Sequence, residues 1–172
     1  MGNYYHGLLV QPDCSRCPLR HKKKVFPDGN LQARLAIVGE APGFNEERQG
    51  RGFIGQSGQL LWQLFEQAGV KREEVWVSNA ALCVDERVRL ASGAVISREE
   101  VKRLANYYCR PRLLQELQTI NPRVTIAIGN WALRSLSGVE EGKILNYRGS
   151  IITTNLDRRL AQELGRKGRR AH

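Results

Sequence analysis

Four cysteines are the residues of this chain whose type and spacing most directly suggest a cofactor. Cys14 and Cys17 form a C-x-x-C pair, whereas Cys83 and Cys109 lie far apart later in the chain. A zinc ribbon with two knuckles needs a second short pair, so this spacing excludes it. Four thiolates can still meet in space around a metal. Zinc, an iron–sulfur cluster and unrelated buried thiols all remain open on spacing alone.

Polar side chains that could act on a substrate follow two predicted strands. The stretch LAIVGEAPGFNEERQGRGFIG, residues 35–55, carries the acids Glu40, Glu46 and Glu47 directly after an apolar run. Asn79, at the end of a second apolar run, offers one hydrogen-bond donor and one acceptor. Taken alone, Glu46 and Glu47 are typical of solvated loop charges and Asn79 of a residue in a turn. Their chemistry therefore depends on the elements that position them.

Those elements alternate between strand and helix. Short apolar runs predict strands at residues 35–38, 75–82, 123–129 and 150–155. Helical periodicity predicts helices at residues 57–69, 98–120 and 130–136. Alternation of this kind predicts an α/β fold with a mainly parallel sheet covered on both faces, and with ligands at the carboxyl ends of the strands.

The first predicted helix has an apolar stripe and two end signals. Ser57 is its expected N-cap and Gly69 its expected stop. The residues expected to share one face are Leu60, Leu61, Leu64, Phe65 and Ala68.

Length and charge favour one soluble domain with a polyanionic partner. The chain has 172 residues, 41% of them apolar, which suits a single domain over residues 1–172. Its net charge is +10 and its pI is 9.9, which favours nucleic acid. The basic tail at about residues 158–172 is either a solvated helix end or a phosphate contact. No apolar run is long enough for a membrane span, so we expect an intracellular, cytoplasmic protein.

Four motifs occur in an informative order: CSRCPLR, IVGEAPGFNEERQGRGFIGQSGQLL, SNAALC and YCRPRLLQELQTINPRVTIAIGNWAL. Together they resemble the iron–sulfur, or family 4, uracil-DNA glycosylases of the uracil-DNA glycosylase superfamily, over roughly residues 14–154. The resemblance implies a three-layer α/β/α sandwich with a four-stranded parallel sheet. It also implies a 4Fe–4S cluster, with zinc as the alternative, on the matching Cys14, Cys17, Cys83 and Cys109.

The same resemblance gives the polar residues roles in removing a flipped base from DNA. Phe53 would stack on the base, and the Asn79 amide would pair with uracil O4 and N3–H. An amide turned over would suit cytosine, so a further contact must fix its orientation. Backbone groups at Gly39 and Ala41, shaped by Pro42 and Gly43, would complete the base pocket.

Two further sets of residues acquire roles from this resemblance. Glu40 and Glu46, with Glu47 in reserve, would stabilise the positive charge on the sugar and orient water. Arg48, Arg51 and the helix start at Ser57 would hold DNA phosphates.

The resemblance fails at two places. Family members carry a His-Pro motif where this chain has Leu156 and Asp157, and its three histidines lie elsewhere. Loss of one such preorganised donor typically costs about 10²- to 10³-fold in rate. Residues 84–100 replace a shorter Arg/Pro-rich loop. A truncated or frameshifted chain would also explain the missing motif.

Three hypotheses follow from these features. The first is a monomeric base-excision repair enzyme that removes uracil from single- or double-stranded DNA, in a prokaryotic or phage setting. The alternative is a DNA-binding domain, of phage or accessory type, that keeps fold and cluster but has little activity. A redox protein without DNA work leaves Asn79, Phe53 and the basic charge unexplained.

Overall fold

The computed structural model describes residues 3–90, 92–138, 143–152, 158 and 162. Its strands are β1 (Tyr4–His6), β2 (Asp28–Asn30), β3 (Leu35–Gly39), β4 (Val75–Asn79), β5 (Val88–Arg89), β6 (Val95–Ile96) and β7 (Val124–Ala127). Its α-helices are α1 (Phe44–Gln49), α2 (Gln56–Gln67), α3 (Arg98–Ile120) and α4 (Asn130–Ser137). Short 3-10 helices occur at Arg72–Glu74 (η1) and Ile144–Tyr147 (η2). Within these described segments, no helix is both long and apolar enough to cross a membrane.

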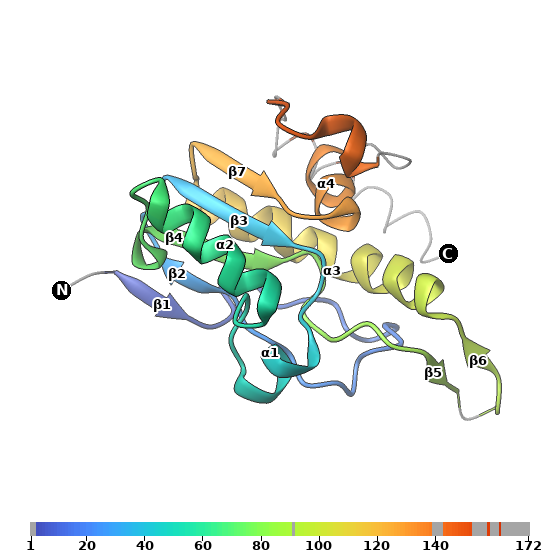
Figure 1. The fold of residues 1–172 in the computed structure, drawn as a ribbon. Helices are drawn as coiled ribbons and strands as arrows, with labels where there is room; N and C mark the ends of the chain where they lie inside the picture. The colour runs from blue at the N-terminus through green and yellow to red at the C-terminus, as the bar shows by residue number, and fades with distance from the viewer. Residues whose placement is uncertain (1–2, 91, 139–142, 153–157, 159–161, 163–172) are drawn as a thin grey trace.

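The central sheet has five strands in the order β1-β2-β4-β3-β7 (Figure 1). β3 pairs in parallel with both β4 and β7, whereas β2 is antiparallel to β1 and to β4. Four of the five strands therefore run in one direction, and β2 runs against them. The expected sheet of four parallel strands is corrected to this mixed sheet. The sequence DGN of β2 lacks the apolar or β-branched residues by which a strand is recognised.

Helices cover both faces of the sheet, which confirms the expected α/β/α layers (Figure 1). Side chains alternate between the two faces along each strand. On one face, the packing of α3 and α4 against β3 and β4 buries Ala36, Val38, Trp76, Leu113, Leu117, Ala132 and Leu136. On the other face, α2 packs against the sheet through Ile37, Val75, Val77, Leu61, Trp62 and Phe65.

Helix α2 differs from its prediction at its start and on its apolar face. Gly55 is the N-cap and makes no side-chain cap bond, so Ser57 lies inside the first turn. Leu60 and Leu64 are 58% and 53% exposed. The sheet instead contacts Leu61, Trp62 and Phe65. Gly58 is buried because the helix approaches the Phe53 backbone there, where a Cβ would lie 2.1 Å from the Phe53 oxygen. The expected stop is confirmed at Gly69, whose φ is +73°.

Helix α3 has the predicted bounds because both of its end signals operate. The Ser97 hydroxyl accepts a hydrogen bond from the Glu100 N–H, and Asn121 takes the left-handed conformation after the last turn. β4 ends at Asn79, three residues earlier than expected.

Two other segments differ from the predicted strands and loops. Residues 84–97 contain the β5–β6 hairpin, which projects from the body of the molecule (Figure 1). Of the strand expected at residues 150–155, residues 150–152 are not in a strand, and the remainder lies outside the described residues.

Candidate functional site

The carboxyl ends of β3 and β4 bring two of the expected site residues to one edge of the sheet. In the parallel register, Gly39 is opposite Asn79. Pairing continues past the strand ends, since the Ala80 N–H donates to the Gly39 carbonyl at 2.8 Å and the Ala81 N–H to the Glu40 carbonyl at 2.9 Å. Glu40 and Asn79 therefore leave the sheet from neighbouring, fixed positions.

Phe53 and Asn79 meet over Gly39. A Cβ at Gly39 would lie 2.4 Å from Asn79 Oδ1 and 2.7 Å from the tip of the Phe53 ring. Glycine is required here because no side chain fits between the ring and the amide. Gly52 also lies close to this amide, since a Cβ built there would be 3.6 Å from Asn79 Nδ2. The ring and amide that were expected to hold a base are thus side by side.

The backbone of Asn79 is fixed by a buried ion pair that sequence reasoning missed. Arg112 Nη2 donates to the Asn79 carbonyl at 2.7 Å, and Arg112 Nη1 donates to Glu116 Oε2 at 2.8 Å. Both charged side chains are fully buried. Glu116 also accepts from the Trp76 indole at 2.9 Å, which ties the pair to β4. The i,i+4 spacing of Arg112 and Glu116 on the predicted helix was the available signal.

Glu40 contacts the start of α4. Its Oε1 accepts from the Trp131 N–H at 3.1 Å, and its Oε2 lies 3.7 Å from the Lys102 ammonium. The positive end of a helix and an ammonium both favour a carboxylate at this place. Gly129, the N-cap of α4, makes the approach possible, because a Cβ there would lie 2.4 Å from Glu40 Cγ. The Glu40 side chain is 31% exposed and so remains open to solvent.

Glu46 connects the starts of two helices. Its Oε2 accepts from the Gly43 N–H and its Oε1 from the Gly55 N–H, both at 3.0 Å. Because Gly43 caps α1 and Gly55 caps α2, this one carboxylate joins the two ends of the segment 43–55, which contains α1 and the loop with Phe53. Glu47, the next residue, is half-buried on α1.

The residues expected to contact phosphates differ in their exposure and in the side chains they already bind. Arg48 is exposed, with an internal hydrogen bond to Asn45, and Ser57 is exposed in the first turn of α2. Arg51 is engaged: its Nε donates to Asp28 Oδ2 at 3.0 Å, although 45% of its side chain is exposed. Ala41 is half-buried against the cluster of apolar residues that contains Cys17 and Cys83.

The four cysteines line one apolar hollow of about 270 Å³, a volume that includes its opening to solvent. Three of them are buried and Cys14 is half-buried. Burial raises the pKa of the Cys17 thiol to about 11 and that of Cys83 to about 12. Such thiols stay protonated unless a cation replaces their protons. No three His, Cys, Asp or Glu side chains within the described part of the chain are arranged to hold a single metal ion.

The position of the missing His-Pro motif, Leu156 and Asp157, lies outside the described residues, as does most of the basic tail. Among the residues described, the His6 ring lies 3.1 Å from the Gly50 carbonyl oxygen, on the loop before Phe53.

These features define an α/β protein in which an aromatic ring, an amide and a carboxylate lie near the carboxyl ends of two parallel strands, and in which four cysteines line one hollow. The sequence model of the uracil-DNA glycosylase superfamily, as a protein family, matches residues 26–169. The chain therefore belongs to this superfamily. The predicted family is therefore confirmed.

Several type-4 uracil-DNA glycosylases are similar to this chain. The protein of Pyrobaculum aerophilum is 34% identical over 149 residues, which cover 84% of this chain and 70% of that protein. The protein of Thermotoga maritima is 33% identical over 141 residues, covering 81% and 68%. The protein of Archaeoglobus fulgidus is 31% identical over 143 residues, covering 80% and 67%.

Proposed function

We propose that this protein is a uracil-DNA glycosylase that hydrolyses the N-glycosidic bond of uracil in DNA as a step of base-excision repair. The observation that carries the proposal is the meeting of the Phe53 ring and the Asn79 amide over Gly39. An aromatic face beside a paired donor and acceptor suits a pyrimidine that has been taken out of the stack. The type-4 names of the similar proteins support the same substrate.

Asn79 would read the base by donating from Nδ2 to uracil O4 and accepting from N3–H at Oδ1. Arg112 supplies the fixed backbone that such reading requires, because it holds the Asn79 carbonyl from the helix behind the sheet. Oδ1 lies toward Gly39 and Nδ2 toward Gly52. Main-chain groups at Gly39 and Ala41 would line the same pocket.

The bond between C1′ and the base nitrogen breaks with positive charge on the sugar and negative charge on uracil. Glu40 would stabilise the sugar and orient the water whose oxygen bonds to C1′; one proton of that water ends on the departing base. Glu46 would act as a second carboxylate, held in place rather than mobile because both of its oxygens accept backbone hydrogen bonds.

The four cysteines would hold a 4Fe–4S cluster. The fit rests on four thiols, three of them buried, that line one apolar hollow. When bound, the cluster would brace Cys14 and Cys17 of the N-terminal segment, Cys83 after β4 and Cys109 on α3 against one another. Cys83 lies four residues after Asn79, so this bracing would also stabilise the pocket.

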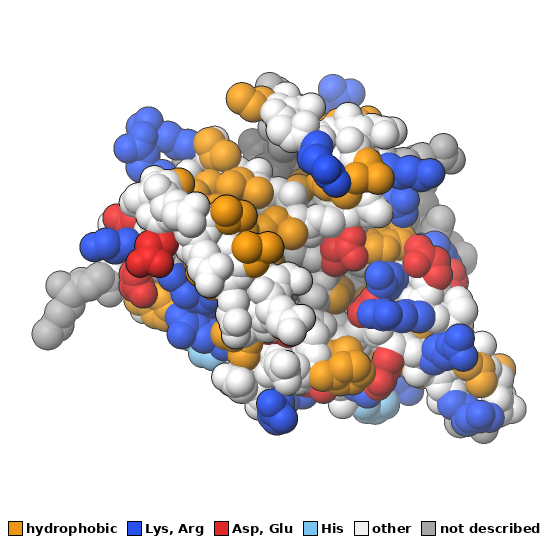
Figure 2. All heavy atoms as spheres, in the orientation of Figure 1, with side chains coloured by type: hydrophobic (Ala, Val, Ile, Leu, Met, Phe, Trp, Pro, Cys, Tyr) orange, Lys and Arg blue, Asp and Glu red, His pale blue; other side chains and the backbone are white. Residues whose placement is uncertain are grey.

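DNA would be bound through its phosphates by a monomer. Arg48 and the first turn of α2 at Ser57 lie on the same segment as Phe53, and Arg51 could contribute its exposed edge. Figure 2 shows Lys and Arg side chains spread widely over the visible face, several of them over the β5–β6 hairpin and the start of α3. A net charge of +10 favours encounter with either single- or double-stranded DNA.

An excision assay tests the proposal and separates it from the binding-only alternative, which no observation on the fold or the similar proteins favours. Oligonucleotides with one uracil, single- and double-stranded, are incubated with the protein and then treated with alkali. We expect strand breaks only at the uracil position. Intact strands at high protein concentration, together with a gel shift, would instead favour the binding module.

A further inference from the structure

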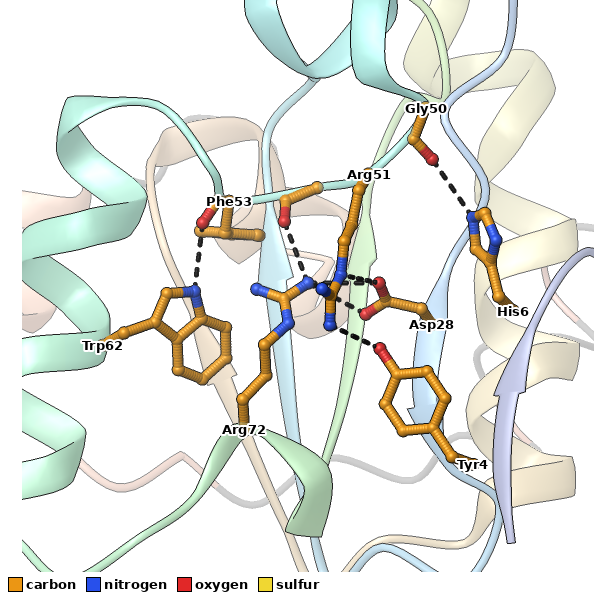
Figure 3. Close-up of polar contacts among 9 residues, drawn as sticks. Tyr4, His6, Asp28, Gly50, Arg51, Phe53, Trp62 and Arg72 are labelled. Carbon is orange, nitrogen blue, oxygen red and sulfur yellow. Dashed lines mark hydrogen bonds and ion pairs between the residues drawn. The ribbon is translucent and has the colours of Figure 1, made fainter.

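Charged and aromatic side chains lie around the loop that carries Phe53 (Figure 3). We call this group the cage; it consists of Tyr4, His6, Asp28, Arg51, Trp62 and Arg72. Phe53 has a φ of +56°, which is unusual for a residue other than glycine. A backbone of this kind persists when the surrounding structure holds it. The contacts around residues 50–53 show what does so.

Three carbonyl groups of this loop are each bound by a side chain from a different element (Figure 3). The Gly50 oxygen lies 3.1 Å from His6 Nε2 on β1. The Gly52 oxygen accepts from Arg72 Nη2 on η1, and the Phe53 oxygen from the Trp62 indole on α2, both at 3.0 Å. These three contacts leave the loop little freedom to move.

Asp28 is at the centre of the cage. It is 2% exposed and accepts from Arg72 Nη2 at 3.0 and 3.1 Å, and from Arg51 Nε at 3.0 Å. The same Nη2 that binds Asp28 also binds the Gly52 carbonyl. Asp28 therefore positions the Arg72 guanidinium, which in turn holds the carbonyl group of Gly52, the residue before Phe53.

Arg72, which holds the Gly52 carbonyl, also contacts Trp62, which holds the Phe53 carbonyl. Its guanidinium lies 4.6 Å from the centre of the Trp62 ring, a cation–π contact that orients the indole. The indole in turn holds the Phe53 carbonyl. Space is also limited from α2, because a Cβ at Gly58 would lie 2.1 Å from the Phe53 oxygen.

We propose that Asp28 and Arg72 are positioning residues for base excision, which act by holding Phe53 at the angle where its ring stacks on the flipped uracil. This inference rests on the proposed function and deepens it. The hydrogen bonds of Arg72 run to Asp28 and to the Gly52 carbonyl, and those of Asp28 run to Arg72 and Arg51. We expect the effect of Asp28 and Arg72 on the rate to depend on Phe53. An effect through Arg51, which also binds Asp28, would appear instead as a loss of DNA affinity, and a buried ion pair that served stability alone would depend on neither residue.

A double-mutant cycle tests this dependence. Single-turnover excision is measured for Arg72→Met, Phe53→Ala and the double variant. We expect Arg72→Met to lower the rate about 10- to 100-fold. In the Phe53→Ala background the same change should alter the rate within about twofold. Two effects that simply multiply would overturn the proposal.

DNA affinity and a matched charge loss provide the controls. Arg123→Met removes the same charge from the exposed residue before β7 and should leave the rate near that of wild type. The dissociation constants of Arg72→Met and Arg123→Met for uracil-containing DNA should agree within about twofold, because phosphate contacts supply most of the affinity. If Arg72→Met does not fold, Arg72→Lys takes its place in the cycle. It keeps a cation beside Asp28 but loses the planar stack on Trp62, so the same non-additivity is expected.

A second readout separates failure of this inference from failure of the proposed function. The exchange of the Trp62 indole N–H with solvent is followed by NMR in wild type, Arg72→Met and Arg123→Met. Faster exchange in Arg72→Met alone would support the positioning role even if wild type released no uracil. Equal exchange in all three proteins would contradict it, whatever the excision assay shows.

Discussion

Phe53 and Asn79 are each held by side chains from other elements of the fold. Asn79 depends on Arg112 and Glu116 behind the sheet, and Phe53 on Arg72 and Trp62 beside it. The motifs predicted Asn79 and Phe53, and the structure brings the two together. Arg112 and Arg72, which hold these residues, could not be predicted from motifs. In sequence, an Arg on a helix or before a strand looks the same whether it is buried in an ion pair or exposed on the surface. Their partners become visible only when distant segments pack.

At the residue scale, Asn79→Ala should separate base recognition from DNA binding. Removing the amide takes away the donor and the acceptor that pair with uracil, so we expect excision to fall by about 10²- to 10³-fold. DNA affinity should stay within about twofold, because phosphates supply it. Both are measured on one uracil-containing duplex, by single-turnover kinetics and by fluorescence anisotropy. Equal losses in both measurements would show that the amide serves the fold or the DNA surface rather than the base.

Among the elements, those with a long apolar or periodic pattern were predicted, whereas the shortest strands were not. Ser97 and Asn121 mark α3, and its predicted bounds are confirmed. β1 and β2 were missed because each has three residues and β2 has none of the types typical of strands. They bear on the proposed site, since Asp28 of β2 and His6 of β1 both contact the segment that includes Phe53. The α2 stripe was placed too broadly, because helical spacing alone does not show which side of a wide stripe meets the sheet.

The start of α4 provides a test at the element scale. Gly129 has a φ of +97° and faces the flexible Glu40 side chain, whereas Gly69 has a φ of +73° and no atom within 4 Å of an added Cβ. Gly69→Ala should cost about 1–2 kcal/mol of stability from its left-handed backbone. Gly129→Ala should cost about 1–3 kcal/mol, because a φ of +97° with a ψ of 168° is adopted almost only by glycine. Only Gly129→Ala should also displace the Glu40 carboxylate, and we expect it to lower excision about tenfold or more.

Urea unfolding and single-turnover excision, run on both variants, check this expectation. A rate for Gly129→Ala equal to that of Gly69→Ala would show that the position of Glu40 at the start of α4 has no part in the reaction.

For the molecule as a whole, the cysteine hollow joins segments that are distant in sequence. Cys14 and Cys17 lie between β1 and β2, Cys83 follows β4 and Cys109 is on α3. The C-x-x-C spacing left zinc, an iron–sulfur cluster and unrelated thiols open, and only packing could show that all four thiols line one space. The basic charge likewise predicted a polyanionic partner without showing where it binds, since the basic side chains do not form a single patch on the face in Figure 2.

Iron should be bound at this hollow and should stabilise the fold. We expect protein purified without oxygen to carry about four iron atoms per chain and a broad visible absorbance. Cys109→Ser should lose both and unfold at a lower urea concentration, because the thiolate that joins α3 to the other segments is gone. Ala105→Ser adds a hydroxyl to the same lining and should keep its iron. One zinc per chain, or no metal at all, would contradict this part of the account.

Release of free uracil from DNA is the direct measure of whether the protein hydrolyses the N-glycosidic bond of uracil. Wild-type protein is mixed in excess with a uracil-containing oligonucleotide, and the free base and the abasic sites are quantified together. The account predicts one uracil for each abasic site, with no release from the same oligonucleotide carrying cytosine or thymine. Intact oligonucleotide bound to the protein, with no free base after prolonged incubation, would contradict it.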